Sequence, residues 1–108
     1  MRGIVWGSTY DIATNKLIQV IKEYNMIGII PDREVITKYN AWVKFENGDY
    51  WVACGPAESA RGHKANISYV DRAINKEFFN TVIKHCTINF PYRGFLFFGE
   101  GELNEYDT

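Results

Sequence analysis

The feature that most constrains the fold of this 108-residue chain is an Asn-Gly dipeptide between two apolar runs. Asn47 and Gly48 tolerate the positive φ angles of a type I′ turn, the tightest connection between antiparallel strands. The flanking runs are rich in aromatic and β-branched residues, namely Trp42, Val43, Phe45, Tyr50, Trp51, Val52 and Ala53. The sequence therefore predicts a β-hairpin over residues 42–53.

Around this hairpin, short apolar runs alternate with segments of helical spacing. Residues 3–6, 67–70 and 95–98 are expected to be buried strands. Apolar residues recur at helical spacing between Ile12 and Tyr24, and Asn75 can cap a second helix whose inner face would include Phe78, Phe79, Val82 and Ile83. Strands separated by helices favour parallel pairing. We therefore expect an α/β fold, a small three-layer sandwich with a mostly parallel sheet plus an antiparallel hairpin.

The length and composition fit one domain. Aromatic residues make up 16% of the chain and the formal net charge is −1, which argues against disorder and against whole-molecule attraction to nucleic acid or anionic lipid. Because the last residues are acidic, we expect residues 1–100 to form the domain and 101–108 to be a flexible tail.

The cysteines and the apolar runs bear on the compartment. Cys54 and Cys86 form no CxxC pair, and they are typical of core thiols in a cytosolic protein. No apolar run approaches the ~20 residues of a membrane span, and the first residues do not resemble a signal peptide. The sequence predicts a cytoplasmic protein that has no membrane partner.

Three predicted strands deliver polar residues to the carboxyl edge of the sheet, where α/β domains usually bind ligands. Ser8 and Thr9 follow the first strand, Asp71 follows the second, and Glu100 lies beyond the third. An aspartate in this position can hold the water shell of Mg²⁺. The alternative is that Asp71 only caps the turn that follows it.

The loop 55–65 (Gly-Pro-Ala-Glu-Ser-Ala-Arg-Gly-His-Lys-Ala) and the strand 67–71 (Ile-Ser-Tyr-Val-Asp) resemble part of the large terminase subunit of tailed phages. Residues 8–17 are similar to the strand-and-helix unit that precedes this loop in that family. The resemblance spans residues 3–100 and implies a P-loop NTPase-like core with a coupling motif near Phe98 and Gly99. It also implies a phage or prophage origin and the cytoplasm of a host cell.

The departures from the family pattern concern catalysis. The chain contains no G-x-x-x-x-G-K-[ST] loop to hold phosphates. The catalytic glutamate expected after Asp71 is Arg72, and a cation cannot deprotonate the attacking water. We therefore expect no ATPase activity from this chain alone. No cofactor is expected, except Mg-nucleotide if another chain supplies the phosphate loop.

Two groups of side chains are candidate contacts. Basic residues that could touch phosphate or nucleic acid are Arg61, Lys64, Arg72 and Lys76, with Tyr69, Tyr92 or Trp51 available to stack bases. Aromatic residues that could form a protein interface are Trp42, Phe45, Tyr50 and Trp51. The alternatives are a solvated basic face and a hairpin whose aromatic residues only cover the sheet.

These observations give two functional hypotheses. The first is a non-catalytic binding or regulatory protein on a degenerate terminase-like core, which binds a larger phage or host protein. The second is one piece of a split DNA-packaging ATPase, in which Asp71 would hold Mg²⁺ while Arg61 or Arg72 contacts phosphate in trans. The partner and the oligomeric state do not follow from the sequence.

Overall fold

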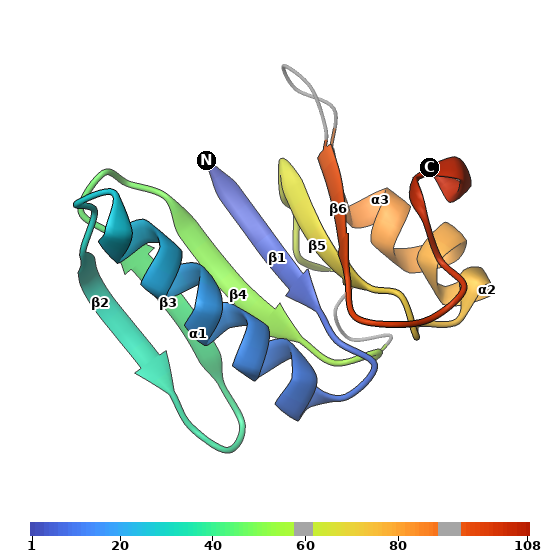
Figure 1. Cartoon of the computed structure of the whole chain (residues 1–108), viewed down its shortest axis with the longest axis horizontal. Coiled ribbons are helices and arrows are strands. Elements are labelled where there is room, and N and C mark those ends of the chain that lie inside the picture. Colours follow the sequence, from blue (N-terminus) through green and yellow to red (C-terminus); the bar gives the residue numbers. More distant parts are fainter. Residues whose placement is uncertain (58–61, 89–93) are drawn as a thin grey trace.

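The computed structural model describes residues 1–57, 62–88 and 94–108. They form a six-stranded mixed sheet in the order β2-β3-β4-β1-β5-β6 (Figure 1). The strands are β1 (Arg2–Trp6), β2 (Pro31–Ile36), β3 (Ala41–Phe45), β4 (Tyr50–Cys54), β5 (Ile67–Asp71) and β6 (Gly94–Phe98). Strand β1 pairs in parallel with β4 and β5, and β5 pairs in parallel with β6, whereas β3 pairs antiparallel with both β2 and β4. The predicted α/β class, with its hairpin, is confirmed.

The helices begin at the residues that the sequence marks as caps. Helix α1 (Tyr10–Met26) starts after Thr9, whose hydroxyl accepts a hydrogen bond from the Ile12 N–H. Asn75 caps the second helical segment, which runs through α2 (Lys76–Phe78), a π-helical turn (Phe79–Ile83) and α3 (Lys84–Cys86). In the described part of the chain, no helix is long and apolar enough to cross a membrane.

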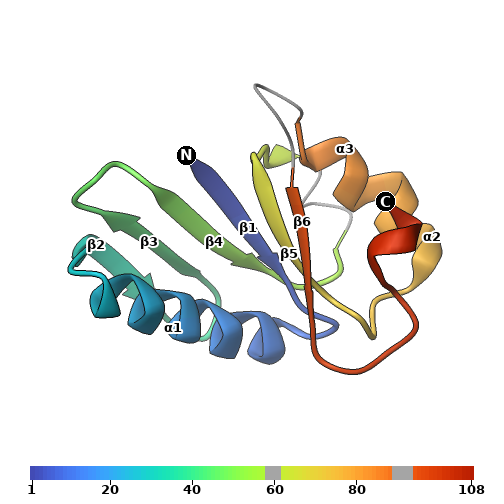
Figure 2. The ribbon, with the colours of Figure 1, turned by 45° about the horizontal axis from the view of Figure 1, so that its top comes forward.

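The two helical segments cover opposite faces of the sheet (Figure 2). Beneath α1 the first core cluster includes Leu17, Val43, Phe45 and Trp51. On the other face the segment from α2 to α3 packs over β1, β5 and β6, and the second core cluster consists of Ile4, Trp6, Cys54, Ala65, Val70, Ile74, Phe79, Val82, Ile83, Cys86 and Leu103. Each helical segment covers only part of its face. The α2–α3 segment leaves β2, β3 and much of β4 uncovered on its side (Figure 2).

Strand β2 is an element that the sequence did not predict. It pairs with β3 at the edge of the sheet, with a register shift between Pro31 and Arg33. Its residues are mostly exposed, and three consecutive ones, Asp32, Arg33 and Glu34, are charged. An edge strand that buries little surface has no apolar alternation to reveal it, so only pairing with β3 identifies it.

The C-terminal residues 101–108, expected to be a flexible tail, lie against the domain in the structure. We call this segment the C-terminal strap. The Leu103 side chain is 2% exposed and belongs to the second core cluster. The Lys76 ammonium lies 2.9 Å from the Asp107 carboxylate, and Asn104 caps a short 3₁₀-helix, η3 (Glu105–Asp107). The fold therefore shows no domain boundary at residue 100, because the buried Leu103 side chain packs the acidic segment 101–108 against the core.

Candidate functional site

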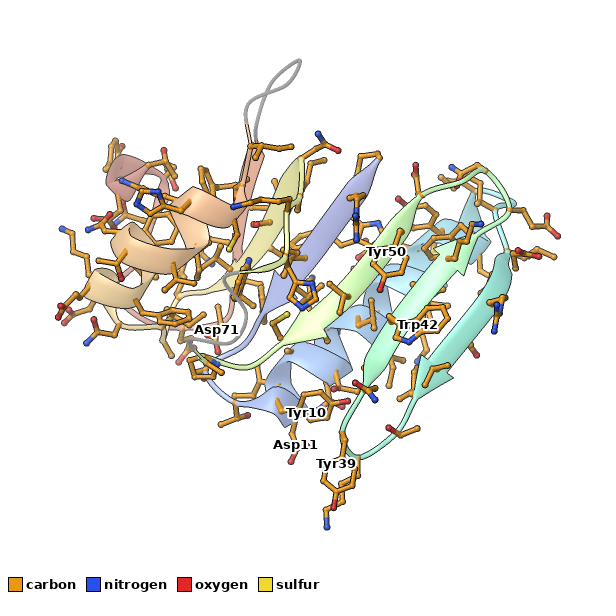
Figure 3. The ribbon with its side chains drawn as sticks, turned by 180° about the vertical axis from the view of Figure 1, so that it is seen from behind. Tyr10, Asp11, Tyr39, Trp42, Tyr50 and Asp71 are labelled. Atoms are coloured by element: carbon orange, nitrogen blue, oxygen red, sulfur yellow. The ribbon has the colours of Figure 1, made fainter. Side chains whose placement is uncertain are left out.

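The uncovered half of the sheet presents aromatic residues to solvent. Trp42 lies opposite Val35 on one side and Val52 on the other, and Tyr50 lies opposite Lys44. Residues directly opposite in a sheet share a face, and the Trp42 and Tyr50 rings stack with centroids 6.0 Å apart. Figure 3 shows both side chains on the side of β3 and β4 turned away from α1. Both are partly exposed.

The same half of the sheet carries positive charge. The Arg2 guanidinium lies 5.1 Å from the centroid of the Tyr50 ring. Arg33 lies opposite Lys44, so both face the same way as Tyr50. In the described strands, the register places Glu34 opposite Val43 and hence on the α1 side. We define the aromatic face as Val35, Trp42, Tyr50 and Val52 with Arg2, Arg33 and Lys44.

A depression of about 380 Å³ adjoins the aromatic face at the carboxyl end of β4. Trp42 and Tyr50 line it together with Tyr10 and His63. The Tyr10 hydroxyl donates a hydrogen bond to the Thr37 carbonyl oxygen at 2.8 Å, which ties the start of α1 to the loop after β2. In that loop, Tyr39 is 80% exposed. The depression is therefore bounded by aromatic side chains from α1, from the loop after β2 and from the strands β3 and β4.

The four aromatic residues predicted as an interface divide between two faces. Trp42 and Tyr50 lie on the aromatic face, but Phe45 and Trp51 are buried beneath α1. The Trp51 indole N–H donates to the Tyr24 hydroxyl at 2.9 Å, and the Phe45 ring stacks on Tyr24 with centroids 3.9 Å apart. Phe45 and Trp51 are therefore corrected to core residues, because alternate residues of a strand point to opposite faces.

Asp71 ends β5 and contacts the loop that follows β1. Its carboxylate accepts hydrogen bonds from the backbone N–H groups of Ser8 at 2.9 Å and Ala73 at 3.0 Å. Burial alone would raise the pKa of Asp71, but the hydrogen bonds from Ser8 and Ala73 outweigh it and lower the pKa below its ordinary value. The carboxylate therefore ties two loops together, as in the capping alternative.

The surroundings of Asp71 bear on its predicted role as a magnesium contact. Among the described residues, no group of three or more His, Cys, Asp or Glu side chains converges on one point. Both Asp71 oxygens already accept backbone N–H groups. Mg²⁺ usually takes one or two carboxylates together with substrate phosphates, so a role for Asp71 as a magnesium contact stays a prediction.

The three predicted basic contacts that the structure describes do not all lie in one patch, although Arg72 and Lys76 line the same depression of about 630 Å³. The Lys64 ammonium donates to the His85 carbonyl oxygen at 3.2 Å, the Arg72 guanidinium donates to the Gly99 carbonyl oxygen at 3.3 Å, and Lys76 pairs with Asp107. Lys64 precedes β5 and Arg72 follows it, so they lie at opposite ends of that strand. Arg61 lies outside the described residues.

The three residues predicted to stack on bases lie in different surroundings. Tyr69 is half-buried beside α1, with the Lys16 ammonium 4.8 Å from its ring centroid. Trp51 is in the core, and Tyr92 lies outside the described residues. The cations of the aromatic face, Arg2, Arg33 and Lys44, were not predicted. The signal that could have identified them is strand alternation with Trp42 and Tyr50, which requires the register of β1 and β2.

The two cysteines are buried, as the sequence predicts for core thiols. Burial, with a smaller effect of the neighbouring Cys86, raises the pKa of the Cys54 thiol to about 12. The thiol is therefore protonated at neutral pH and is a poor nucleophile, although Cys54 lines the depression.

Comparison with known proteins adds no relative. No family model, curated protein or solved structure matches this chain. The comparisons therefore neither support nor contradict the resemblance to the terminase large subunit, and the aromatic face is the site on which a functional argument can be built.

Proposed function

We propose that this chain is a non-catalytic binding or regulatory protein that contacts a larger protein partner through the aromatic face. The observation that supports the proposal most is the stacked pair Trp42 and Tyr50, partly exposed on a half-sheet that none of the described helices covers. The resemblance to the terminase family adds the proposal of a phage or prophage origin, a partner from the phage or its host, and the host cytoplasm as the compartment.

The composition of the aromatic face suits a protein interface. Tryptophan, tyrosine and arginine dominate the binding energy of protein complexes, and they do so at the centre of the contact. Here they project from hydrogen-bonded strands, and Arg2 packs over the Tyr50 ring. Side chains held in place before binding lose less conformational entropy on association. The positive charge of Arg2, Arg33 and Lys44 favours an acidic partner surface.

Single-stranded nucleic acid is a second candidate, because the register places the cations Arg33 and Lys44 on the aromatic face and Glu34 on the other. Bases stack on aromatic side chains while lysine and arginine contact the phosphates. The split DNA-packaging ATPase is a further alternative. It predicts ATP hydrolysis only when this chain is mixed with one that carries a phosphate loop.

The test is a pull-down of the tagged protein from a bacterial lysate, with and without nuclease. We expect a retained protein that survives nuclease and is lost with Trp42→Ala or Tyr50→Ala. The matched control is Tyr106→Ala, since Tyr106 is 90% exposed and lies away from the aromatic face. Retention that is indifferent to Trp42 and Tyr50 would overturn the proposal.

Tryptophan fluorescence distinguishes the nucleic-acid candidate. Trp6 and Trp51 are 0% and 3% exposed, whereas Trp42 is partly exposed, so quenching by acrylamide reports mainly on Trp42. Titration with oligo(dT) would quench the emission, with a strong dependence on salt, if bases stack on this ring. Unchanged emission at low salt would rule out stacking on Trp42.

A further inference from the structure

The two edges of the sheet differ in how they are protected. Edge strands usually carry charges, proline or a bulge, which discourage pairing with another chain. Strand β2 has all three, with Pro31, a register shift after it, and the charged run 32–34. Strand β6, the last strand in the described sheet at the other edge, has none of them.

Strand β6 has the composition of an interior strand. Its sequence is Gly-Phe-Leu-Phe-Phe, and it pairs with β5 in unbroken register over its whole length. Phe97 packs against the second core cluster, and Phe98 packs against the first. Parallel strands with apolar residues on both faces normally lie between two neighbours.

On the outer side of β6, the backbone groups of Phe97 have no backbone partner among the described residues. The Gly94 N–H donates to Asn66 and the Phe98 carbonyl oxygen accepts from Arg72, so alternate residues of β6 face β5. By the same alternation the N–H and C=O of Phe97 point away from β5. Among the described residues outside the β5–β6 ladder, no backbone hydrogen bond reaches them.

An apolar surface continues from this edge onto the α1 side of the sheet. Leu96 is 46% exposed, and Ile12 on α1 is 39% exposed. Ile12 and Phe98 line a shallow depression of about 190 Å³, and the Lys16 ammonium lies 5.4 Å from the Phe98 ring centroid. An additional strand beside β6 would cover Leu96 and adjoin this surface.

We propose that the outer edge of β6 at Phe97 binds an extended strand of another polypeptide. Strand pairing supplies the backbone hydrogen bonds, and alternate apolar side chains of the guest cover Leu96. The charge of the residues that follow β6 indicates which strand would bind. Beyond β6 the chain carries Glu100, Glu102 and Glu105, none of which has an ion pair in the described part of the chain. The fitting guest is therefore an apolar strand flanked by lysine or arginine.

This surface is separate from the aromatic face, so the two proposals can fail independently. The probe is a displayed library of random twelve-residue peptides, selected on the immobilised full-length chain. We expect enrichment of peptides in which apolar residues alternate and lysine or arginine flanks them. Binding of an enriched peptide should slow hydrogen exchange of the Phe97 amide.

The decisive variant is Leu96→Lys, which places a charge on the edge without altering a buried residue. We expect it to weaken binding of an enriched peptide by about tenfold or more. The matched control is Ile36→Lys on the opposite edge strand, where Ile36 is 40% exposed, and it should bind as the wild type does. Circular dichroism checks that both variants are folded.

Several results would overturn the proposal. No enrichment, enrichment without the alternating apolar pattern, or equal binding to Leu96→Lys would each do so. Protection from exchange around Trp42 instead of Phe97 would assign the peptides to the aromatic face. A wild-type dimer that Leu96→Lys converts to a monomer would identify a second copy of this chain as the occupant.

Discussion

At the scale of single residues, the buried polar side chains beside the second core cluster form a series of hydrogen bonds. The Trp6 indole N–H donates to the Ser68 hydroxyl at 3.1 Å, and the Ser68 and Thr87 hydroxyl oxygens lie 2.7 Å apart. The Thr87 hydroxyl donates to the Ile83 carbonyl oxygen at 2.8 Å, so Ser68 must donate to Thr87. These bonds link β1, β5 and the end of the second helical segment.

Replacing Ser68 by alanine tests this network. The Trp6 N–H would lose its acceptor in a buried site, and we expect the free energy of unfolding to fall by about 1–3 kcal/mol. Urea denaturation measures the change. Thr81→Ala removes a hydroxyl exposed on the same helical segment and should change stability by less than about 0.5 kcal/mol. Equal effects of the two substitutions would contradict the role of the network.

Asp71 makes stability depend on pH. Its folded-state pKa lies below the unfolded value of about 3.9. The carboxylate therefore stabilises the fold above about pH 4, and this contribution is lost as pH falls through the folded pKa. Asp71→Asn should cost about 1–3 kcal/mol at pH 7. The difference from wild type should shrink towards pH 3 in urea titrations, and a difference constant with pH would contradict this account.

At the scale of elements, the C-terminal strap depends on one close approach. A Cβ atom at Gly101 would lie 2.0 Å from the Arg72 carbonyl oxygen, and the Leu103 N–H donates to that same oxygen at 3.3 Å. The backbone of the strap therefore lies directly on the turn after β5. Leu103 reaches the second core cluster from that position.

Gly101→Ala should displace the strap and expose Leu103, at a cost of about 1–3 kcal/mol in unfolding free energy. Limited proteolysis should also remove residues from the C-terminus faster than in wild type. Gly62→Ala is the matched control, because a Cβ at Gly62 meets no atom within 4 Å. Wild-type stability in Gly101→Ala would show that the strap adjusts without loss of the Leu103 contact.

At the scale of the whole molecule, the two core clusters share the central strands. Strand β1 contributes Val5 to the cluster under α1, and Ile4 and Trp6 to the other cluster. Strand β5 likewise contributes Tyr69 to one and Val70 to the other. Because a strand cannot leave one cluster without leaving the other, the domain should unfold in one cooperative step.

Single-tryptophan variants test this cooperativity. Trp42→Phe with Trp51→Phe leaves Trp6 as the reporter of the second cluster, and Trp42→Phe with Trp6→Phe leaves Trp51 as the reporter of the first. In each variant the fluorescence midpoint in urea should coincide with the far-ultraviolet circular dichroism midpoint. Separate midpoints within one variant would indicate that the clusters unfold independently.

Local patterns were sufficient for much of the fold. The hairpin around Asn47-Gly48, the helical spacing from Ile12 and the cap at Asn75 are confirmed, because turns, helix periodicity and capping depend on residues close in sequence. The predicted type I′ conformation is wrong, because Gly48 has a positive φ of 94° but Asn47 does not. The carboxylate of Asp71 also lies at the end of its predicted strand. These features required no knowledge of distant contacts.

Only the tertiary structure decided the rest. Strand β2 exists through pairing with β3, and Leu103 is buried through contacts with residues far away in sequence. The predicted two-residue turn would set Phe45 opposite Tyr50, whereas the structure pairs Lys44 with Tyr50 and so puts Trp42 and Tyr50 on one face. Nor did the sequence say which face of the hairpin α1 would cover. Local sequence specifies elements and their alternation, whereas burial depends on which surfaces meet, and that is a property of the whole packed chain.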